Sequence, residues 1–486
     1  MINTEKLHQA YHLHTENHHD PRGEELYKEV EPNKLQTAND LQVYGYLALE
    51  FGEIHKAVKA LQQSIKKDNK TAQSFLLLGI AQRRLKEYSK AIAAFRQALK
   101  LEPKTIDAIY NLGITLDDAQ NYESAIDVLE KGLDIAPKDT DLLNAIAGAS
   151  VSAGYTEDAV EYYRQAIDLE PNFAPFQYNL SQVLLQIGEW AEGWKLFDSR
   201  LAFRNQSLNP KTDASFWKGE NLEGKSVLVW NEQGFGDSLQ FVRYIPLLKQ
   251  KGAKVYLRIQ PALKRLMEHN FEEIEAVFTP KEDLPTTDFQ IPIMSLPQFF
   301  GKYPITLQES IVKVFPSIET NLKSNFKNQI SKIQPKLSKV GIVWSGNPNH
   351  PDDQKRSIPA RFYSRLLKLK NFEWYSLQMG RASNDLKHPQ LTDLTSSIED
   401  FADTAVQIEA LDLVISVDTA VAHLAGSMNK KVWLLLDYAP DWRWGMEEAE
   451  TNWYSSMQIF RQSKVGDWNG VMNKVLKELK REVAGG

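Results

Sequence analysis

The chain of 486 residues contains no cysteine. A disulfide, a thiolate zinc site and a cysteine nucleophile are therefore excluded, and the composition fits a reducing compartment. No apolar run reaches the roughly 18 residues that a membrane-spanning helix needs. The first 20 residues are polar and lack the apolar core of a signal peptide. We therefore expect a cytoplasmic protein.

A surplus of positive charge is also absent. The chain carries 57 lysines and arginines against 63 aspartates and glutamates, a formal net charge of -6. Proteins that bind nucleic acid or a membrane surface through their overall charge need a basic face. The charge balance argues against a nucleic-acid partner, and the length predicts two to four domains.

Histidine is sparse, and half of the ten histidines lie in the first 20 residues. His8 and His12 are four positions apart, a spacing that suits a metal ion on one face of a helix. The alternative is a polar leading segment, with a partial repeat around residues 23–33. We predict this alternative for residues 1–37, and no metal site.

Residues 38–205 repeat with a period of 34. Each unit has two small residues and one large apolar residue at fixed positions, and proline closes three units. Small residues let two antiparallel helices approach, the large residue fills the space between them, and proline ends the second helix. The positions are Gly45, Gly79, Gly113, Ala147 and Ser181; Ala57, Ala91, Ala125, Ala159 and Gly193; Leu61, Phe95, Leu129, Tyr163 and Phe197; and Pro103, Pro137 and Pro171.

This pattern resembles the tetratricopeptide repeat in length and in the chemistry of each position. Five units in register imply a superhelix of helix pairs with a concave face. We favour a groove that recruits a protein or peptide. The alternative is an array that makes contacts within a complex, including an oligomer, or that caps the domain behind it.

Residues 206–224 are polar and predict a linker. From 225 to 335, apolar strands alternate with helices, which predicts a parallel sheet. We expect a helix over 238–250 and strands over 226–230, 254–259, 275–278 and 289–293.

The turn after the first of these strands contains Gly234 and Gly236, followed by Asp237. It lacks the third glycine of a dinucleotide-binding fingerprint. Two glycines permit close approach of a ligand to the backbone. Asp237 is then either a catalytic carboxylate at the mouth of the sheet or the N-cap of the helix.

A second α/β unit spans residues 336–486. A polar loop over 347–356 follows its first strand, and Asp352 and Asp353 in that loop predict a solvated turn rather than a metal motif. A helix is expected to open at residues 357–359 and another to close the chain. The predicted strands cover 339–344, 373–378, 412–417 and 431–436, and the closing helix 468–479.

The stretch 412–426 passes from a buried strand to a helix, with Ser416, Asp418 and Thr419 at the junction. The free N–H groups of a helix N-terminus favour an anion, and ligands of open α/β sheets bind at the carboxyl ends of strands. The stretch therefore predicts a site for a phosphate-bearing ligand. The alternative is that Asp418 or Thr419 only caps the helix.

Three segments together resemble the heptosyltransferase-type glycosyltransferases of family 9. They are 227–246 with its Gly-Phe-Gly-Asp turn, 340–359 with a basic residue before Ile358-Pro359, and 412–426 with Asp418-Thr419-Ala420 and His423. With the repeats, the chain is similar to bacterial repeat-bearing glycosyltransferases and, more distantly, to the family 41 protein O-GlcNAc transferases. The resemblance implies an α + α/β protein whose repeats precede a GT-B fold of two Rossmann-like domains.

In that fold, residues 225–335 would form the acceptor side and 336–486 would bind a nucleotide-sugar donor. The resemblance makes Asp237 the general base, with His423 as the second catalytic candidate. Donor-binding residues would be Ser345, Asn347, Arg356, Gln378, Asp403, Thr404, Asp418, Thr419, Ala420 and His423, and the phosphate/acceptor loop would be Gln233, Gly234 and Gly236.

The chemistry of a nucleoside-diphosphate leaving group explains why these residue types are needed. Helix N–H groups and Arg356, together with Lys355, would neutralise the departing charge, so no metal and no cofactor beyond the nucleotide sugar is expected. Family 9 enzymes have no repeats and act on lipid-linked sugars, whereas the repeats here indicate a polypeptide acceptor. The loop 441–444 lies outside the family pattern and either stacks on a sugar or packs the interdomain cleft.

We therefore expect a glycosyltransferase that moves a sugar to a hydroxyl of a protein or peptide held by the repeats. The alternative is a non-catalytic scaffold that binds a nucleotide sugar and uses its repeats for protein–protein interaction.

Overall fold

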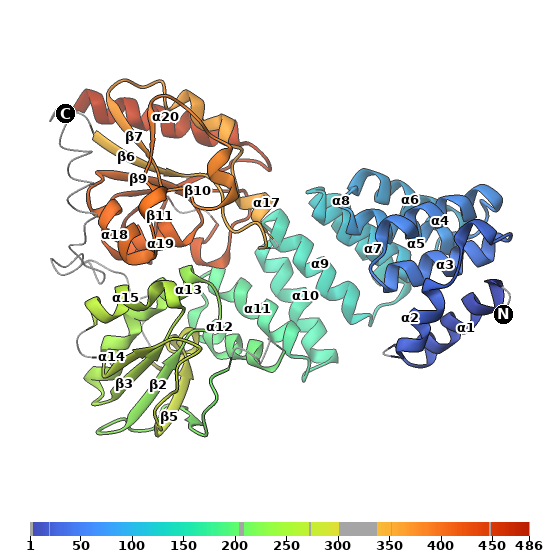
Figure 1. The fold of residues 1–486 in the computed structure, drawn as a ribbon, viewed down its shortest axis with the longest axis horizontal. Helices are drawn as coiled ribbons and strands as arrows, with labels where there is room; N and C mark the ends of the chain where they lie inside the picture. The colour runs from blue at the N-terminus through green and yellow to red at the C-terminus, as the bar shows by residue number, and fades with distance from the viewer. Residues whose placement is uncertain are drawn as a thin grey trace. The chain divides into compact units, whose positions relative to one another are not determined.

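The computed structural model describes residues 3–18, 20–203, 209–271, 274–300, 338–350, 352–446 and 449–485. The chain divides into two compact units, Met1–Leu180 and Ser181–Gly486. The described part of the first unit is helical, whereas the second contains two β-sheets (Figure 1). No helix in these ranges is both long enough and apolar enough to cross a membrane.

Successive helix pairs follow the period of 34, so the predicted helical array is confirmed. The unit boundary falls inside the first helix of the last pair. The pairs are α3 (Ala38–Glu50) with α4 (Ile54–Lys67), α5 (Ala72–Arg84) with α6 (Tyr88–Leu101), α7 (Ile106–Asp118) with α8 (Tyr122–Ile135), α9 (Thr140–Ala153) with α10 (Thr156–Leu169), and α11 (Ala174–Gln186) with α12 (Trp190–Phe197).

Glycine sets the spacing within the first three of these pairs. A Cβ atom placed on Gly79 of α5 would lie 2.5 Å from the ring of Phe95 on α6, and one on Gly113 would lie 2.3 Å from Leu129. Both large side chains are fully buried. Each large residue therefore occupies the space that the small residue of its own pair leaves open.

The leading segment forms a helix pair, and the second helix of this pair overlaps the partial repeat predicted around residues 23–33. Helices α1 (Asn3–Glu16) and α2 (Pro21–Lys28) bury Leu7, Ala10 and Tyr27 in one core with α3. Three apolar positions among mostly polar residues are too few to reveal this pair in the sequence.

The first sheet of the second unit has the strand order β1-β5-β2-β3-β4, and all its recorded pairings are parallel. The single helix expected over 238–250 is interrupted by a 3-10 turn at Val242–Tyr244, just before Pro246. The elements are β1 (Ser215–Phe216), β2 (Ser226–Trp230), α13 (Phe235–Phe241), α14 (Ile245–Gln250), β3 (Lys254–Arg258), α15 (Pro261–Asn270), β4 (Ala276–Phe278) and β5 (Phe289–Pro292).

The second sheet has the order β11-β12-β10-β9-β6-β7-β8, and only its edge strand β11 pairs antiparallel. Strand β12 was not expected, because its sequence mixes apolar and polar residues. The elements are β6 (Ser338–Val343), α17 (Asp353–Arg356), η8 (Ala360–Arg365), β7 (Phe372–Ser376), β8 (Leu391–Asp393), α18 (Phe401–Glu409), β9 (Leu413–Val417), α19 (Ala420–Ser427), β10 (Val432–Leu436), β11 (Glu450–Thr451), β12 (Tyr454–Arg461) and α20 (Trp468–Gly485).

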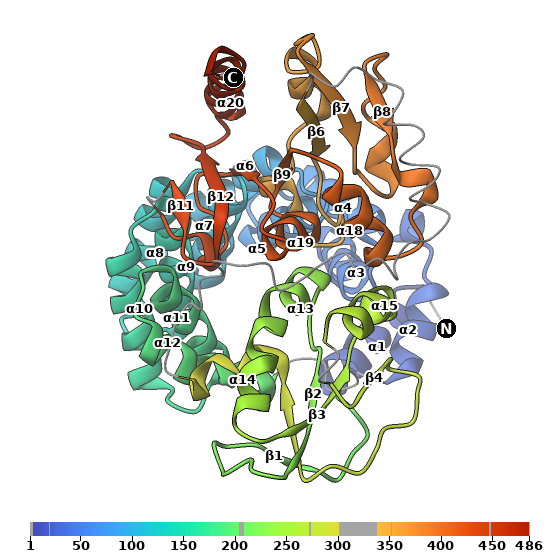
Figure 2. The ribbon, with the colours of Figure 1, turned by 90° about the vertical axis from the view of Figure 1, so that its left-hand side faces the viewer.

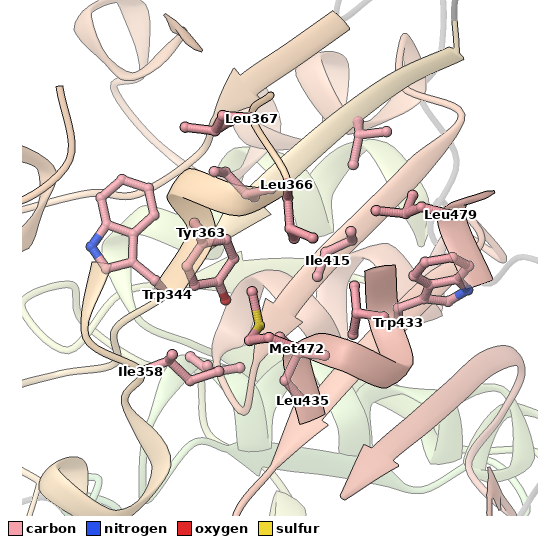
Figure 3. Close-up of a cluster of buried hydrophobic side chains, with 14 of the residues drawn as sticks. Trp344, Ile358, Tyr363, Leu366, Leu367, Ile415, Trp433, Leu435, Met472 and Leu479 are labelled. Carbon is pink, nitrogen blue, oxygen red and sulfur yellow. The ribbon is translucent and has the colours of Figure 1, made fainter. Parts of the chain in front are cut away.

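One face of this second sheet carries an aromatic-rich core. Figure 3 shows Trp344, Tyr363, Trp433 and Met472 converging on the central strands, with Met472 contributed by α20. The helix expected to open at 357–359 is the 3-10 helix η8 that follows those residues, and it supplies Tyr363. This core makes the strands rigid and so fixes the loops at their carboxyl ends.

We predict opposite effects for two glycine substitutions in the helical array. Gly79→Ala should lower the free energy of unfolding by about 1–3 kcal/mol, because the added methyl overpacks against Phe95. Gly148→Ala is the matched control, since the nearest atom to its added methyl is the Tyr163 hydroxyl at 4.0 Å. It should gain about 0.5–1 kcal/mol through helix propensity. Far-UV circular dichroism during urea unfolding measures both; equal stabilisation would refute the packing argument.

Candidate functional site

Two strand-to-helix turns meet in the second unit. The first turn follows β2 and leads into α13, and the second follows β9 and leads into α19. Figure 1 and Figure 2 both show α13 directly against α19, and the two helices share many residue contacts. A Cβ atom on Gly236 would lie 3.0 Å from the ring of His423. Sequence segments almost 190 positions apart therefore form one local structure.

The first turn of α19 has unused backbone donors. The N-cap residue Thr419 makes no capping hydrogen bond with its side chain, and its Oγ1 lies 3.0 Å from Ser416 Oγ. Within the described ranges, the N–H groups of Ala420 and Val421 have no hydrogen-bond partner, and both residues are half-buried. Such donors at the positive end of a helix dipole favour an anion.

Arg356 adds positive charge beside this turn. Its guanidinium packs over Gly346, where a Cβ atom would lie 2.7 Å from Arg356 Nη2. Beside the larger effect of burial, its positive charge lowers the pKa of both Asp418 and His423. This favours the ionised form of Asp418 and the neutral form of His423. Arg356 Nε is buried, lies 3.6 Å from Asp353 Oδ1 and makes no hydrogen bond to any residue described. Arg356 therefore keeps donor capacity for an anion.

Three of the residues predicted to bind the nucleotide-sugar donor lie at the ends of β6 and β7 and form hydrogen bonds with the backbone there. They are Ser345, Asn347 and Gln378. The side chain of Gln378 is buried; its Oε1 accepts hydrogen bonds from the N–H groups of Trp344 and Ser345 at 2.9 and 2.8 Å, and its Nε2 donates to two carbonyls. The side-chain amide thus makes all the hydrogen bonds it usually can, two accepted by its oxygen and two donated by its nitrogen. The hydroxyl of Ser345 accepts from Ser357, whereas Asn347 is exposed and caps its own turn.

Burial shifts two titratable groups of the α19 turn in opposite directions. It raises the pKa of Asp418 to about 6, and the Asp441 carboxylate adds to the rise. It lowers the pKa of His423 well below its ordinary value, with Arg443 lowering it further, so this imidazole is neutral near pH 7. His423 Nδ1 lies 2.9 Å from the Tyr454 hydroxyl, and Nε2 lies 3.8 Å from Asp418 Oδ1.

Asp237 is the third residue of α13 rather than its N-cap. Its Oδ2 accepts a hydrogen bond from the N–H of Gly234 at 2.9 Å, and its Oδ1 pairs with Arg443 Nη2 at 2.5 Å. The helix begins at Phe235 rather than at residue 238. The sequence predicted the later start because Gly236, a poor helix former, lies in the first turn. Both oxygens of Asp237 are thus engaged in this structure.

The loop predicted to face a phosphate or acceptor is also engaged by protein groups. Gly236 packs against His423, so its missing side chain makes room for the imidazole. Gln233 and Gly234 are exposed, and their carbonyl groups accept hydrogen bonds from Gln260 Nε2 at 2.8 and 3.1 Å. Close approach of two helices explains Gly236 without a ligand.

Asp403 and Thr404 lie in the first turn of α18. The carboxylate of Asp403 is buried and pairs with Arg265 of α15, which also forms two hydrogen bonds to Asp400 at 2.8 and 2.6 Å. Thr404 Oγ1 donates to the Asp400 carbonyl at 3.2 Å. These residues hold α18 against α15 and form a second contact between the two sheet-bearing parts.

The loop 441–444 packs against neighbouring elements, which is one of its two predicted uses. The Trp442 ring contacts that of Trp194 on α12, with centroids 5.5 Å apart. Trp444 is buried and stacks on His423 at 5.2 Å and an interplanar angle of 28°. Arg443 donates to Gln240 Oε1 at 2.7 Å. Both tryptophan rings are therefore occupied by protein groups.

Sequence reasoning missed Gln240, Arg243 and Tyr454. The buried Arg243 donates from Nη1 to the Trp453 carbonyl at 2.8 Å, and its guanidinium lies 4.7 Å from the centre of the Tyr454 ring. Burial lowers the pKa of this arginine. The available signal was that Gln240 and Arg243, three positions apart, interrupt an otherwise apolar helix face.

A cavity of about 380 Å³ opens at the carboxyl ends of β7 and β8. Only β6 separates β7 from β9 in the sheet, so the cavity and the α19 turn share one sheet edge. No motif or periodicity marked this segment in the sequence. The cavity is lined by Ser376, Ser383, Leu386, Lys387, His388, Pro389, Leu391 and Asp393.

Two models of the tetratricopeptide repeat match the chain, one over residues 45–104 and 147–207 and the other over 83–148. The helical array is therefore a tetratricopeptide-repeat array, and such repeats imply protein–protein interaction.

The chain is also similar to protein FlbA of Caulobacter vibrioides, with 23% identity over 345 residues, which cover 64% of this chain and 55% of the relative. The chain thus spans about half the length of this curated relative. Among solved structures, MamA from Desulfovibrio magneticus has 22% identity and a TM-score of 0.31, covering 34% of this chain and 92% of its own. A tetratricopeptide repeat protein from Parabacteroides merdae has 16% identity and a TM-score of 0.37, covering 42% and 80%.

The raised pKa of Asp418 predicts a pH-dependent effect of Asp418→Asn. The pKa of Asp418 is about 6 in the folded protein and about 4 in the unfolded chain, so the folded state binds this proton more tightly. The resulting contribution to the free energy of unfolding is fully present below about pH 4 and is lost as pH rises to about 6. At pH 7 the buried carboxylate should cost about 2–3 kcal/mol. The variant should therefore gain stability over the wild type at pH 7 but not at pH 4, as measured by denaturant unfolding.

Asp385→Asn is the charge-matched control, because Asp385 is exposed. A stability difference for Asp418→Asn that stays constant with pH, or that grows towards acid, would contradict the assignment.

Proposed function

We propose that the chain is a metal-independent glycosyltransferase that moves a sugar from a nucleotide-sugar donor to a hydroxyl of a protein or peptide. In this proposal the two sheet-bearing parts of the second unit are the Rossmann-like domains of a GT-B fold. The repeats recruit the polypeptide acceptor. The parallel sheets and the contact of α13 with α19 support the proposal.

The observation that carries the proposal is the first turn of α19. Its N–H groups at Ala420 and Val421 are half-buried and unpartnered among the described residues, at the carboxyl end of a central parallel strand. A diphosphate placed there would accept two N–H hydrogen bonds and meet the positive end of the helix dipole. Pre-oriented donors of this kind stabilise the negative charge that develops on a leaving group.

Arg356 is the second group suited to that charge. It has unused donor capacity beside the α19 turn, and a guanidinium binds phosphate oxygens through two N–H groups at once. With Arg356 and the helix N–H groups in place, neutralisation of the diphosphate needs no metal ion. We assign the nucleoside to the 380 Å³ cavity on the same sheet edge, because a cavity of that size suits a small ligand.

In the transfer step, the acceptor oxygen forms a bond to the anomeric carbon, and the bond from that carbon to the diphosphate breaks. The electron pair of the broken bond leaves on the diphosphate, and the acceptor proton goes to a base. Asp237 is the proposed base, and it lies one residue from Gly236, which packs on His423. His423 is the second candidate. Its imidazole is unprotonated, but burial and the neighbouring arginines oppose its protonation, so it ranks below Asp237 as a base.

One observation favours the alternative of a non-catalytic scaffold. Both oxygens of Asp237 are engaged, one by Gly234 and the other by Arg443. A carboxylate that joins two structural elements needs no catalytic role to explain its place. This alternative keeps the donor site and the protein-binding repeats but performs no transfer.

The donor site predicts the effect of Arg356→Ala. The variant should bind a nucleoside diphosphate more weakly by about 1.5–3 kcal/mol, the range for a hydrogen bond to a charged group. Isothermal titration calorimetry with ADP, GDP, UDP and CDP identifies the nucleotide and then measures the loss. Arg361→Ala is the control, because Arg361 is exposed and packs on Phe362. If neither the wild type nor the variant binds any of these nucleotides, the donor assignment fails.

The two candidate functions differ in the effect of Asp237→Asn. If Asp237 is the base, turnover with the identified donor should fall by about 10²–10⁴-fold with donor affinity little changed. Asp441→Asn is the matched control, since Asp441 is the other carboxylate partner of Arg443, and it should keep most of its turnover.

Undiminished turnover in Asp237→Asn would limit Asp237 to a structural role and make His423 the next residue to test. A wild-type protein that binds donor but transfers no sugar to protein or to water would establish the scaffold alternative.

A further inference from the structure

We propose that His14, His18 and Glu50 bind a divalent transition-metal ion of the zinc type. This site lies in the first unit and is independent of the proposed transferase function. It joins the end of α1 to the end of α3.

The three side chains present their donor atoms to one point. His18 Nδ1 lies 3.1 Å from His14 Nε2, and His14 Nε2 lies 3.4 Å from Glu50 Oε2. All three donor atoms lie within 4.8 Å of one another. His18 lies in the turn that follows α1, and its ring lies 4.7 Å from that of His14 between centroids.

Two of the three donor separations match those of a tetrahedral zinc ion, and the third lies within 4.8 Å. Zinc binds imidazole nitrogen and carboxylate oxygen at about 2.0–2.2 Å, so two donors at the tetrahedral angle are about 3.3 Å apart. The separations of 3.1 and 3.4 Å lie on either side of that value. Two histidines and one glutamate are also a known donor set for zinc, with the fourth position open to water.

Packing holds the central ligand in place. His14 is buried, and its ring makes edge contacts with Tyr46 and Phe51 at centroid distances of 6.1 and 5.3 Å. His18 and Glu50 are exposed, which gives an ion and its water access to the cluster. A fixed buried histidine with two accessible ligands is a pre-organised site.

The pair noted in the sequence, His8 and His12, is not part of this site. His8 Nε2 bonds to Asp40 at 2.9 Å, and His12 lies 3.3 Å from Glu16. In the described part of the chain, the residues that bring three such donors together are His14, His18 and Glu50. Long-range folding thus selects different histidines from those that local spacing suggests.

A bound ion would cross-link the leading helix pair to the first repeat. The polypeptide between His18 and Glu50 contains α2 and almost all of α3. An ion bound to both ends of that segment restricts the unfolded chain and stabilises the packing of α1 on α3. The site therefore gives the terminal helix pair a metal-dependent attachment.

Calorimetric titration of the full chain, without a histidine tag, with zinc chloride tests the proposal. We expect one ion per chain and at least tenfold weaker binding in both His18→Gln and Glu50→Gln, because removal of even an outer partner of a ligand costs about 10–100-fold. His12→Gln is the matched control from the same helix; its side chain is 70% exposed, and it should bind zinc like the wild type.

Both ligand variants change exposed residues, so a failure to fold is not expected to obscure the result. Zinc should also raise the midpoint of thermal unfolding in the wild type and in His12→Gln but not in the two ligand variants. Absence of saturable binding in the wild type, unchanged affinity in His18→Gln, or an equal loss in His12→Gln would each overturn the proposal.

Discussion

The contact between the two sheet-bearing parts of the second unit depends on the buried guanidinium of Arg443. Its side chain is 8% exposed, and it pairs with Asp237 and Gln240 from α13 and with Asp441 of its own loop. A buried charge is tolerated only when it is paired and hydrogen-bonded. The same guanidinium lowers the pKa of His423. One arginine therefore joins α13 to the 441–444 loop and adds to the effect of burial in keeping His423 neutral.

The electrostatic character of the turn follows from this arrangement. Arg356, Arg443 and Arg243 all oppose protonation of His423, while burial opposes ionisation of Asp418. The α19 N-terminus adds the partial positive charge of its free N–H groups. Arg443 is already paired with Asp237 and Asp441, whereas Arg356 has only a 3.6 Å contact with Asp353. Arg356 and the free N–H groups of α19 are therefore the groups that favour an added anion, and the donor phosphate is the ligand we propose for them.

Local patterns were sufficient to predict most of the architecture, but not the contacts that complete the site. Strand β2 and the central strands of the second sheet were identified because continuous apolar runs specify buried parallel strands, and the period of 34 specified the repeats. Strand β12 was missed because half of its residues are polar. The order of parallel strands gathers the predicted loops at one edge, yet the pairing of Asp237 with Arg443 joins positions 206 residues apart. Such pairs leave no periodic signal.

The close fit of glycine to a large residue within the first three repeat pairs has a consequence for the history of the chain. The space beside Gly79 is filled by Phe95, and the space beside Gly113 by Leu129. The contact between the two helices of each of these pairs is therefore completed by residues of the same pair. Duplication or deletion of one full period therefore leaves these contacts intact. A deletion that ends inside a pair separates a glycine from the large side chain that packs against it. The array can change length only in whole units.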